Sequence, residues 1–579
     1  MLFSKFKSNL ILEFILACFF IGVFSYLIAI LFSYPYYSIG SIGGNSAYDG
    51  EPDYFANIIS TLINGHSMDF LHPGIPINQL SAFMINLFSS TLTVEQIIEI
   101  SRATIIFFNC MMIYIGSRLF LQQHLILTLL LIAILIAYPA GFILIDNLSP
   151  NSILFGLSVL LTAIGTKLRY KITSFHLLYG FLLGLAISIK YISLIIVLPL
   201  LVSLIFDSNI INMRATKAIK TIFFIGLISF LSFMILAWPI LPVSPYIFTH
   251  HGLISSDLIR VLQNSNYIFI LFFLILPSFF ILIKGFKAIR NKGIKDSYYL
   301  TCIALIIPVL IISTIKLIQD TSLISVGHSL RNFLPILGMI VLFVPYILKI
   351  KLIPKRYIYI FSAIFFISMV FFKVNFNNQS NYAASLEQKN FSLFVEQYND
   401  YDFLAFYPPS AFISTELFVA WADYRYGDSR VVFSDQKAFF RSTPMQKKIR
   451  IINSRKFDLM PPNNKPSYRY FDAISKSKFF SKTQKQVALN QMNLLSPKSL
   501  CTSLFDGFNV TKRSILFFPQ SLGSYIENDN LINIDIAKSF VSELKSELYN
   551  SCKIDSEISE SSYKDQIFYV LVISPPYSS

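Results

Sequence analysis

Residues 47–57 of the chain read Ala47-Tyr48-Asp49-Gly50-Glu51-Pro52-Asp53-Tyr54-Phe55-Ala56-Asn57. Pro52 suits the first position of a helix, and up to Gly65 the apolar residues recur on one helical face: Phe55, Ile58, Ile59, Leu62 and Ile63. After His72-Pro73-Gly74 the pattern repeats from Pro76, with Leu80, Phe83, Met84 and Leu87 on one face. Both segments are too short to cross a bilayer, so we predict two helices lying flat at a membrane surface beside an acidic loop.

The composition is that of a polytopic membrane protein. The chain has 579 residues, of which 54% are hydrophobic and 16% aromatic, and its mean hydropathy is +0.60. These values exclude an ordinary soluble protein. The net charge of +15 fits cytoplasmic loops rich in Lys and Arg better than it fits a nucleic-acid-binding protein, so no nucleic-acid partner is expected.

Apolar runs of about 20 residues, the length that spans a bilayer, recur along the first two thirds of the chain. The first, from about 10 to 32, is longer than the apolar core of a signal peptide and is expected to stay as an uncleaved membrane helix. Further spans are expected near 102–121, 124–145, 150–167, 173–189, 191–207, 218–240, 265–284, 298–317, 329–349 and 356–374. The prediction is therefore about eleven membrane helices.

The distribution of basic residues orients these spans. If the amino terminus is cytoplasmic, the cytoplasmic gaps hold Arg118, Lys167 to Lys171, Arg214 to Lys220, Lys284 to Lys295 and Lys349 to Arg356. The outward loop from Tyr34 to Ile98 contains no Lys or Arg at all. By the positive-inside rule the amino terminus is cytoplasmic, and an odd number of spans places the carboxyl-terminal part outside.

The composition changes near residue 375, which divides the chain into two domains. Residues 1–375 form the predicted transmembrane domain, with its first outward loop at 34–98, and residues 376–579 form an outward soluble domain of mixed α and β structure. Cys501 and Cys552 fall in this second domain, where a disulfide between them is an open alternative to two free thiols.

Three carboxylates in the first outward loop are candidates for catalysis. A general base must lie where an acceptor hydroxyl reaches it, and Asp49 in its glycine-rich loop meets that need; the alternative is a solvated turn aspartate. Glu51 precedes Pro52, so it either takes part in catalysis or complements the helix dipole. Asp53 either binds substrate or metal, or faces water.

Basic residues on the same outward side complement the charge of the acidic loop. Lys190 follows a predicted span, Lys316 ends another, and Arg331 begins a third, shortly after His328. Gathered around one cavity, they would bind a phosphate. Taken singly, each is better explained by contact with lipid head groups. Five histidines also fall outside, but their spacings specify no metal site, and a divalent metal is left open: His66, His72, His250, His251 and His328.

Taken together, these motifs resemble the GT-C membrane glycosyltransferases, in particular the protein mannosyltransferase and aminoarabinose transferase branch, similar to glycosyltransferase family 39. The resemblance covers about residues 1–375 and is carried by Asp49-x-Glu51, Tyr54, His72-Pro73, Leu148-Ser149-Pro150, Gly180-x-x-x-Gly184 before Lys190, and Arg331-Asn332-Phe333-Leu334-Pro335. In three places the chain departs from that pattern: Gly50 separates the acidic pair, Gly74 replaces a second proline, and Asn332 replaces a tyrosine.

The resemblance implies an inverting transfer of a sugar from a polyprenyl-phosphate carrier to a glycan, lipid or protein acceptor on the outer face. It assigns Asp49 as the general base, with Glu51 in the same catalytic loop. Lys190 and Arg331 are expected to stabilise the departing lipid phosphate. Substrate contacts are also expected from Asp53, Tyr54, His72 and His328.

A transporter or flippase is the main alternative, and it predicts ionisable residues in the middle of spans and paired interrupted helices. A polymerase or ligase that uses diphosphate-linked sugars and a purely structural scaffold are further alternatives. The expected location is the inner membrane of a bacterial envelope, although an endoplasmic reticulum membrane would give the same topology. The donor sugar and the oligomeric state are not specified by the sequence.

Overall fold

The structure is a computed structural model, and it describes the helices and strands named below together with scattered single positions. The described residues are 8–31, 51–64, 74–87, 92, 94–120, 125, 127–129, 131–132, 150–167, 173–190, 193, 197, 200, 215–237, 338, 402–406, 449–452, 514–519, 556–563 and 566–573, and some positions within 472–492 and 542–550. Six of the predicted spans therefore lie wholly or largely outside the described residues, as do Cys501, Cys552 and the predicted domain boundary near 375.

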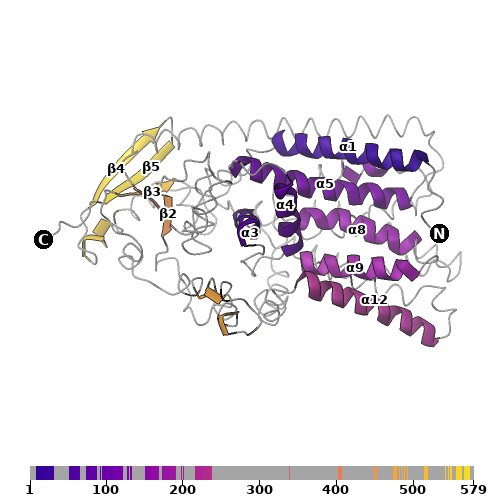
Figure 1. Ribbon diagram of the computed structural model, residues 1–579. Helices are drawn as coiled ribbons and strands as arrows, with labels where there is room; N and C mark the ends of the chain where they lie inside the picture. The colour runs from indigo at the N-terminus through magenta and orange to yellow at the C-terminus, as the bar shows by residue number, and fades with distance from the viewer. Residues whose placement is uncertain are drawn as a thin grey trace, which may run out of the picture.

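The five long helices of the described residues lie side by side in a row (Figure 1). They are α1 (Ser8–Leu31), α5 (Val94–Phe120), α8 (Pro150–Lys167), α9 (Thr173–Ile189) and α12 (Ala215–Leu236). Each packs against the next in that order, so α1 and α12 form the two outer members of the described bundle. Each of these helices occurs where the sequence predicts an apolar span, although α5 begins eight residues before the predicted start.

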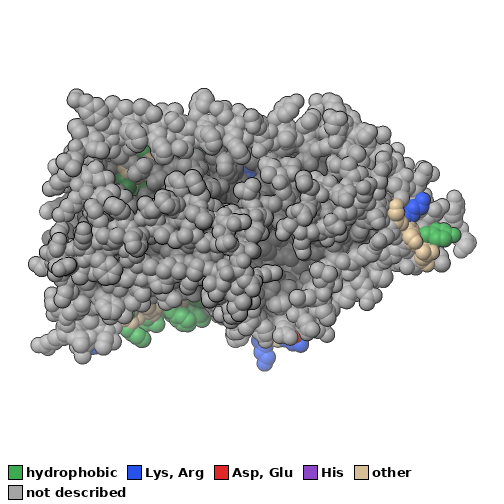
Figure 2. All heavy atoms as spheres, turned by 180° about the vertical axis from the view of Figure 1, so that it is seen from behind, with side chains coloured by type: hydrophobic (Ala, Val, Ile, Leu, Met, Phe, Trp, Pro, Cys, Tyr) green, Lys and Arg blue, Asp and Glu red, His purple; other side chains and the backbone are tan. Residues whose placement is uncertain are grey.

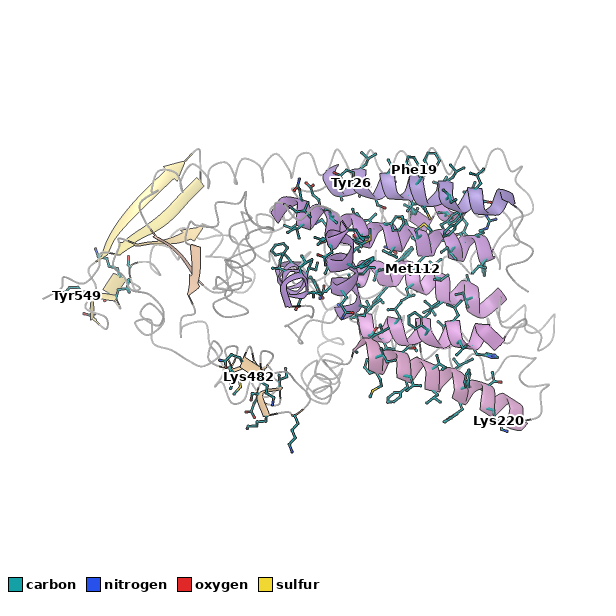
Figure 3. All side chains as sticks on the ribbon, in the orientation of Figure 1. Phe19, Tyr26, Met112, Lys220, Lys482 and Tyr549 are labelled. Atoms are coloured by element: carbon teal, nitrogen blue, oxygen red, sulfur yellow. The ribbon has the colours of Figure 1, made fainter. Side chains whose placement is uncertain are left out.

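The outer helices expose apolar side chains that a soluble protein would bury. On α1, Phe19 and Tyr26 are 62% and 51% exposed, and Figure 3 shows them on the side away from α5. On α12, Phe223, Phe230 and Ile235 are also exposed, and Figure 2 shows hydrophobic side chains at the lower edge of the molecule, below the bundle. Such faces suit contact with lipid.

Two of the described helices are long and apolar enough to cross a bilayer, over Leu12–Ala29 and Gln96–Phe120, and three shorter apolar stretches accompany them. A signal sequence or the core helix of a soluble protein passes the same test. Insertion of this bundle in a membrane therefore remains a prediction.

Polar contacts join neighbouring helices of the bundle. Glu13 of α1 pairs with Arg118 of α5, and the Tyr114 hydroxyl donates a hydrogen bond of 2.9 Å to the same Glu13 carboxylate. The early part of α1 and the late part of α5 therefore lie at one end of the bundle. Between α5 and α8, the Asn109 side chain accepts a hydrogen bond of 2.8 Å from the backbone N–H of Gly156.

The Asn109 hydrogen bond gives a first prediction. Asn109 is buried, so the Asn109→Ala variant should lose about 1 kcal/mol of stability, the usual effect of removing one buried or interhelical hydrogen bond. Thermal unfolding of the purified protein in detergent would measure the loss. Asn550→Ala is the matched control because Asn550 is exposed, and it should leave the melting temperature unchanged. Equal melting temperatures for wild type and both variants would contradict a stabilising role for the Asn109 contact.

Two shorter helices lie across one end of the bundle: α3 (Glu51–Asn64) and α4 (Ile75–Asn86). Both helices form where the sequence predicts them, and α3 buries Phe55, Ile58 and Ile59 as its apolar spacing predicts. The predicted apolar face of α4 is wrong, because Phe83 and Leu87 are 58% and 62% exposed and the helix buries Ile77, Ala82 and Ile85 instead. α3 packs on α4, and α4 packs on α5 and α9. In Figure 1, α4 runs across the long helices and α3 is seen nearly along its axis. Neither helix runs parallel to the bundle, although their position relative to a membrane stays a prediction.

The carboxyl-terminal part contains a five-stranded sheet in the order β2-β1-β3-β5-β4. The strands are β1 (Asp402–Phe406), β2 (Ile449–Ile452), β3 (Ser514–Pro519), β4 (Ser556–Tyr563) and β5 (Gln566–Ile573). β1 is parallel to β2 and to β3, whereas β5 is antiparallel to both β3 and β4. Figure 1 shows the sheet on the side of the bundle where α3 and α4 lie.

Candidate functional site

The acidic end of α3 is positioned by its packing on α4. Glu51 and Asp53 are the first and third residues of α3, and the next residue, Tyr54, is only 1% exposed. Tyr54 and Phe55 thus fix the first turn of α3 against the rest of the protein. The acidic first turn also suits the positive end of the helix dipole, which favours carboxylates at this position.

Gly74 explains one departure from the expected motif. It precedes α4 with φ of 110°, a left-handed conformation that proline does not adopt because its ring holds φ near −65°. The Gly74 carbonyl then accepts hydrogen bonds from the N–H groups of Ile77 and Asn78, at 2.9 and 3.0 Å. A glycine in place of the second proline therefore allows the chain to turn directly into α4.

Lys190 lies at the end of the bundle that α4 covers. It follows the last residue of α9, Ile189, and its N–H donates to the Ala186 carbonyl at 3.2 Å. Its own carbonyl accepts a hydrogen bond of 2.9 Å from the N–H of Ser193, and the residue is half-buried. Because α4 packs on α9 and carries α3, the sequence-predicted cation and the acidic first turn of α3 are brought to one end of the bundle.

Arg102 is a second cation near this end, and the sequence analysis missed it. It lies eight residues after the start of α5, a rise of about 12 Å along the helix, and is 1% exposed. A buried guanidinium needs a partner, and Arg102 has at least one polar or electrostatic interaction in the structure. An ionisable residue buried in an apolar helix of spanning length is a candidate for function. The signal was present in the sequence: Arg102 is the first cation after the long loop that lacks Lys and Arg.

The buried face of α4 includes two polar residues among apolar ones. Asn78 and Ser81 are 1% and 0% exposed, and they are three residues apart and so share a helical face. Neither the Asn78 amide nor the Ser81 hydroxyl has a hydrogen-bond partner within the part of the chain that the structure describes. Unpaired buried polar atoms are unusual in proteins and call for ordered water or a ligand.

The remaining predicted site residues lie outside the described residues: Asp49, His72, His328 and Arg331. Gly338, seven residues after Arg331, is described, and a side chain added there would meet Ser158 and the Phe155 carbonyl of α8. Gly338 itself therefore lies against α8. Within the described ranges no group of three or more His, Cys, Asp or Glu residues could hold a metal ion.

Comparison with known proteins adds no identification. No model of a known protein family matches the sequence. No curated protein matches it either.

Proposed function

We propose that the protein is an integral-membrane glycosyltransferase of GT-C-like architecture. It would move a sugar from a polyprenyl-phosphate donor to a glycan, lipid or protein acceptor, with inversion, on the outer face of a membrane. The observation that carries the proposal is the position of α3, whose acidic first turn is held across the end of the bundle where α9 ends and Lys190 follows.

The proposed topology follows from which residues share an end of the bundle. Arg118 pairs with Glu13 near the start of α1, and Figure 3 shows Lys220 at the end of α12 away from α3 and α4. Basic residues thus collect at the end that we assign to the cytoplasm. The opposite end, with α3, α4 and the sheet, is assigned to the outside of a bacterial inner membrane.

The proposed reaction uses a carboxylate as the general base and cations to stabilise the leaving phosphate. The acceptor oxygen attacks the anomeric carbon of the donor while Asp49 takes the hydroxyl proton. The bond between that carbon and the phosphate oxygen breaks, and its electron pair leaves with the lipid phosphate. Lys190 and Arg331 would stabilise the growing negative charge. We add Arg102 to this group because it is a buried cation on α5, which packs against α4.

Arg102 also favours the second candidate function, a transporter or flippase of lipid-linked or polar substrates. Buried charge within a membrane helix is typical of a transport pathway. The two functions differ in chemistry, because a transferase breaks the bond between sugar and phosphate and a flippase leaves the donor intact.

A reconstitution experiment separates them. Purified protein would be placed in vesicles with a panel of radiolabelled polyprenyl-phosphate sugars, and the label would be followed in the lipid and aqueous phases. The proposal expects labelled sugar in water or on an added acceptor. Intact donor that has only exchanged leaflets would overturn it in favour of transport.

A further inference from the structure

We propose that three buried polar side chains at the end of the bundle covered by α4 hold the sugar of the donor: Asn78 and Ser81 of α4, and Ser193 after α9. This inference rests on the proposed function, because it names the part of the donor that the same site recognises. The three residues are uncharged, so their chemistry differs from that of the cations proposed for the phosphate.

The buried face of α4 supplies two of the three side chains. Asn78 and Ser81 are 1% and 0% exposed, and they share this face with three apolar residues: Ile77, Ala82 and Ile85. α4 packs on α3, α5 and α9, and its buried face is the one that meets them. The two polar residues therefore lie where α4 joins the rest of the described bundle.

Ser193 is the third member of the group, and it is 0% exposed. Its backbone N–H donates a hydrogen bond of 2.9 Å to the Lys190 carbonyl, so it lies one turn beyond the cation proposed for the phosphate. α9, which α4 contacts, ends directly before Lys190. The three side chains and Lys190 thus belong to the same end of the described bundle.

None of the three side chains has a hydrogen-bond partner among the residues that the structure describes. The unpaired atoms are the amide nitrogen and oxygen of Asn78 and the hydroxyl oxygens of Ser81 and Ser193. A buried polar group without a partner destabilises a protein, and an apolar side chain of the same shape would not carry that cost. Polar side chains at these positions are explained if a ligand with hydroxyl groups completes their hydrogen bonds.

The chemistry of the three residues favours a neutral, hydroxylated ligand. The amide both donates and accepts hydrogen bonds, as does each serine hydroxyl. They match sugar hydroxyls better than a phosphate, which the neighbouring Lys190 suits. A sugar carried on a phosphate would present its hydroxyls and its anion to these two kinds of group together. The three side chains are closed off from solvent, so the sugar reaches them when α4 shifts against α5 and α9.

Ser117 provides a matched control. Its hydroxyl is also buried and, within the described part of the chain, also unpaired. It lies at the opposite end of the bundle, next to Arg118, which pairs with Glu13 of α1. Ser117→Ala and Ser81→Ala remove the same atom from equally buried positions, so both variants should melt at or above the wild-type temperature.

The test measures lipid binding by the full-length protein in detergent micelles, without an acceptor. Polyprenyl phosphate without a sugar would be compared with a panel of polyprenyl-phosphate hexoses and pentoses. We expect wild type to bind at least one sugar-bearing lipid at least tenfold more tightly than the bare phosphate. Asn78→Leu, Ser81→Ala and Ser193→Ala should each bind that lipid about tenfold more weakly, because hydrogen bonds to the sugar are lost, and should bind the bare phosphate like wild type. Ser117→Ala should bind both lipids like wild type.

Equal affinity of wild type for the bare and the sugar-bearing lipids would overturn the site. Wild-type affinities in all three site variants, or an equal loss in Ser117→Ala, would overturn it as well. The two serine variants keep the test decisive if Asn78→Leu fails to fold. Binding needs no turnover, so the two proposals fail separately. Sugar transfer without a gain in affinity from the sugar would refute the site alone, and sugar-dependent binding of a donor that stays intact would refute the transferase function alone.

Discussion

Replacing Gly184 by alanine is expected to destabilise the bundle strongly. Gly180 and Gly184 form the contact of α9 with α12, and a Cβ at Gly184 would clash with the Ser229 carbonyl and lie 2.6 Å from the Ser232 Cβ and 2.9 Å from the Phe233 nitrogen. Two of these atoms belong to the backbone, so they cannot move without shifting α12. Forcing a methyl group into such a contact costs about 3 kcal/mol, and the melting temperature in detergent should fall accordingly.

Gly226→Ala is the matched control for that variant. Gly226 lies on α12, and a Cβ there would meet nothing within 4 Å. Alanine is the better helix former, so this variant should melt at or above the wild-type temperature, with a gain of up to about 1 kcal/mol. If Gly184→Ala and Gly226→Ala melt alike, the close packing of α9 on α12 is wrong.

The Asp49→Asn variant is expected to lose sugar transfer almost completely. Asparagine has nearly the shape of aspartate but cannot accept the acceptor proton, and removal of a general base lowers the rate by about 10²–10⁴-fold. The initial rate of sugar transfer from the donor found in the vesicle experiment would be compared with that of wild type. The binding of the donor should change little, because the loss is in the chemical step.

Glu51→Gln is the comparison that identifies the base. Glu51 is the first residue of α3, where its charge also complements the helix dipole, so we expect a smaller effect on the rate of transfer. A larger loss with Glu51→Gln than with Asp49→Asn would move the role of base to Glu51. Wild-type rates in both variants would remove the acidic loop from the mechanism.

The sequence predicts local structure wherever one face of an element is buried. The spacing of Phe55, Ile58 and Ile59 predicts α3 because the same periodicity decides which residues face the core, and these three residues are buried in the structure. The apolar run from Ile567 to Ile573 likewise coincides with β5. The sequence does not predict that β5 pairs with β3 and β4, because strand pairing depends on contacts between segments far apart in the chain.

The candidate site was predicted only in part, because the burial of its residues also depends on segments far apart in the chain. Hydropathy marks Arg102 as the edge of an apolar segment, but the burial of its side chain depends on helices that follow later in the sequence. The motif Gly180-x-x-x-Gly184 was noted as part of a family resemblance, whereas the structure uses both glycines for the contact with α12. Tyr54 was predicted to bind substrate, and the structure places it in the buried face of α3; a substrate contact from this residue stays a prediction.

The identity of the lipid product tests the central claim most directly. Purified protein would be incubated with the polyprenyl-phosphate sugar that it turns over, and the lipid fraction would be analysed by mass spectrometry over time. The proposed function predicts that polyprenyl monophosphate appears in equal amount to the sugar transferred, at a rate that falls in Asp49→Asn. A donor that is bound but stays intact, or turnover confined to diphosphate-linked donors, would contradict it.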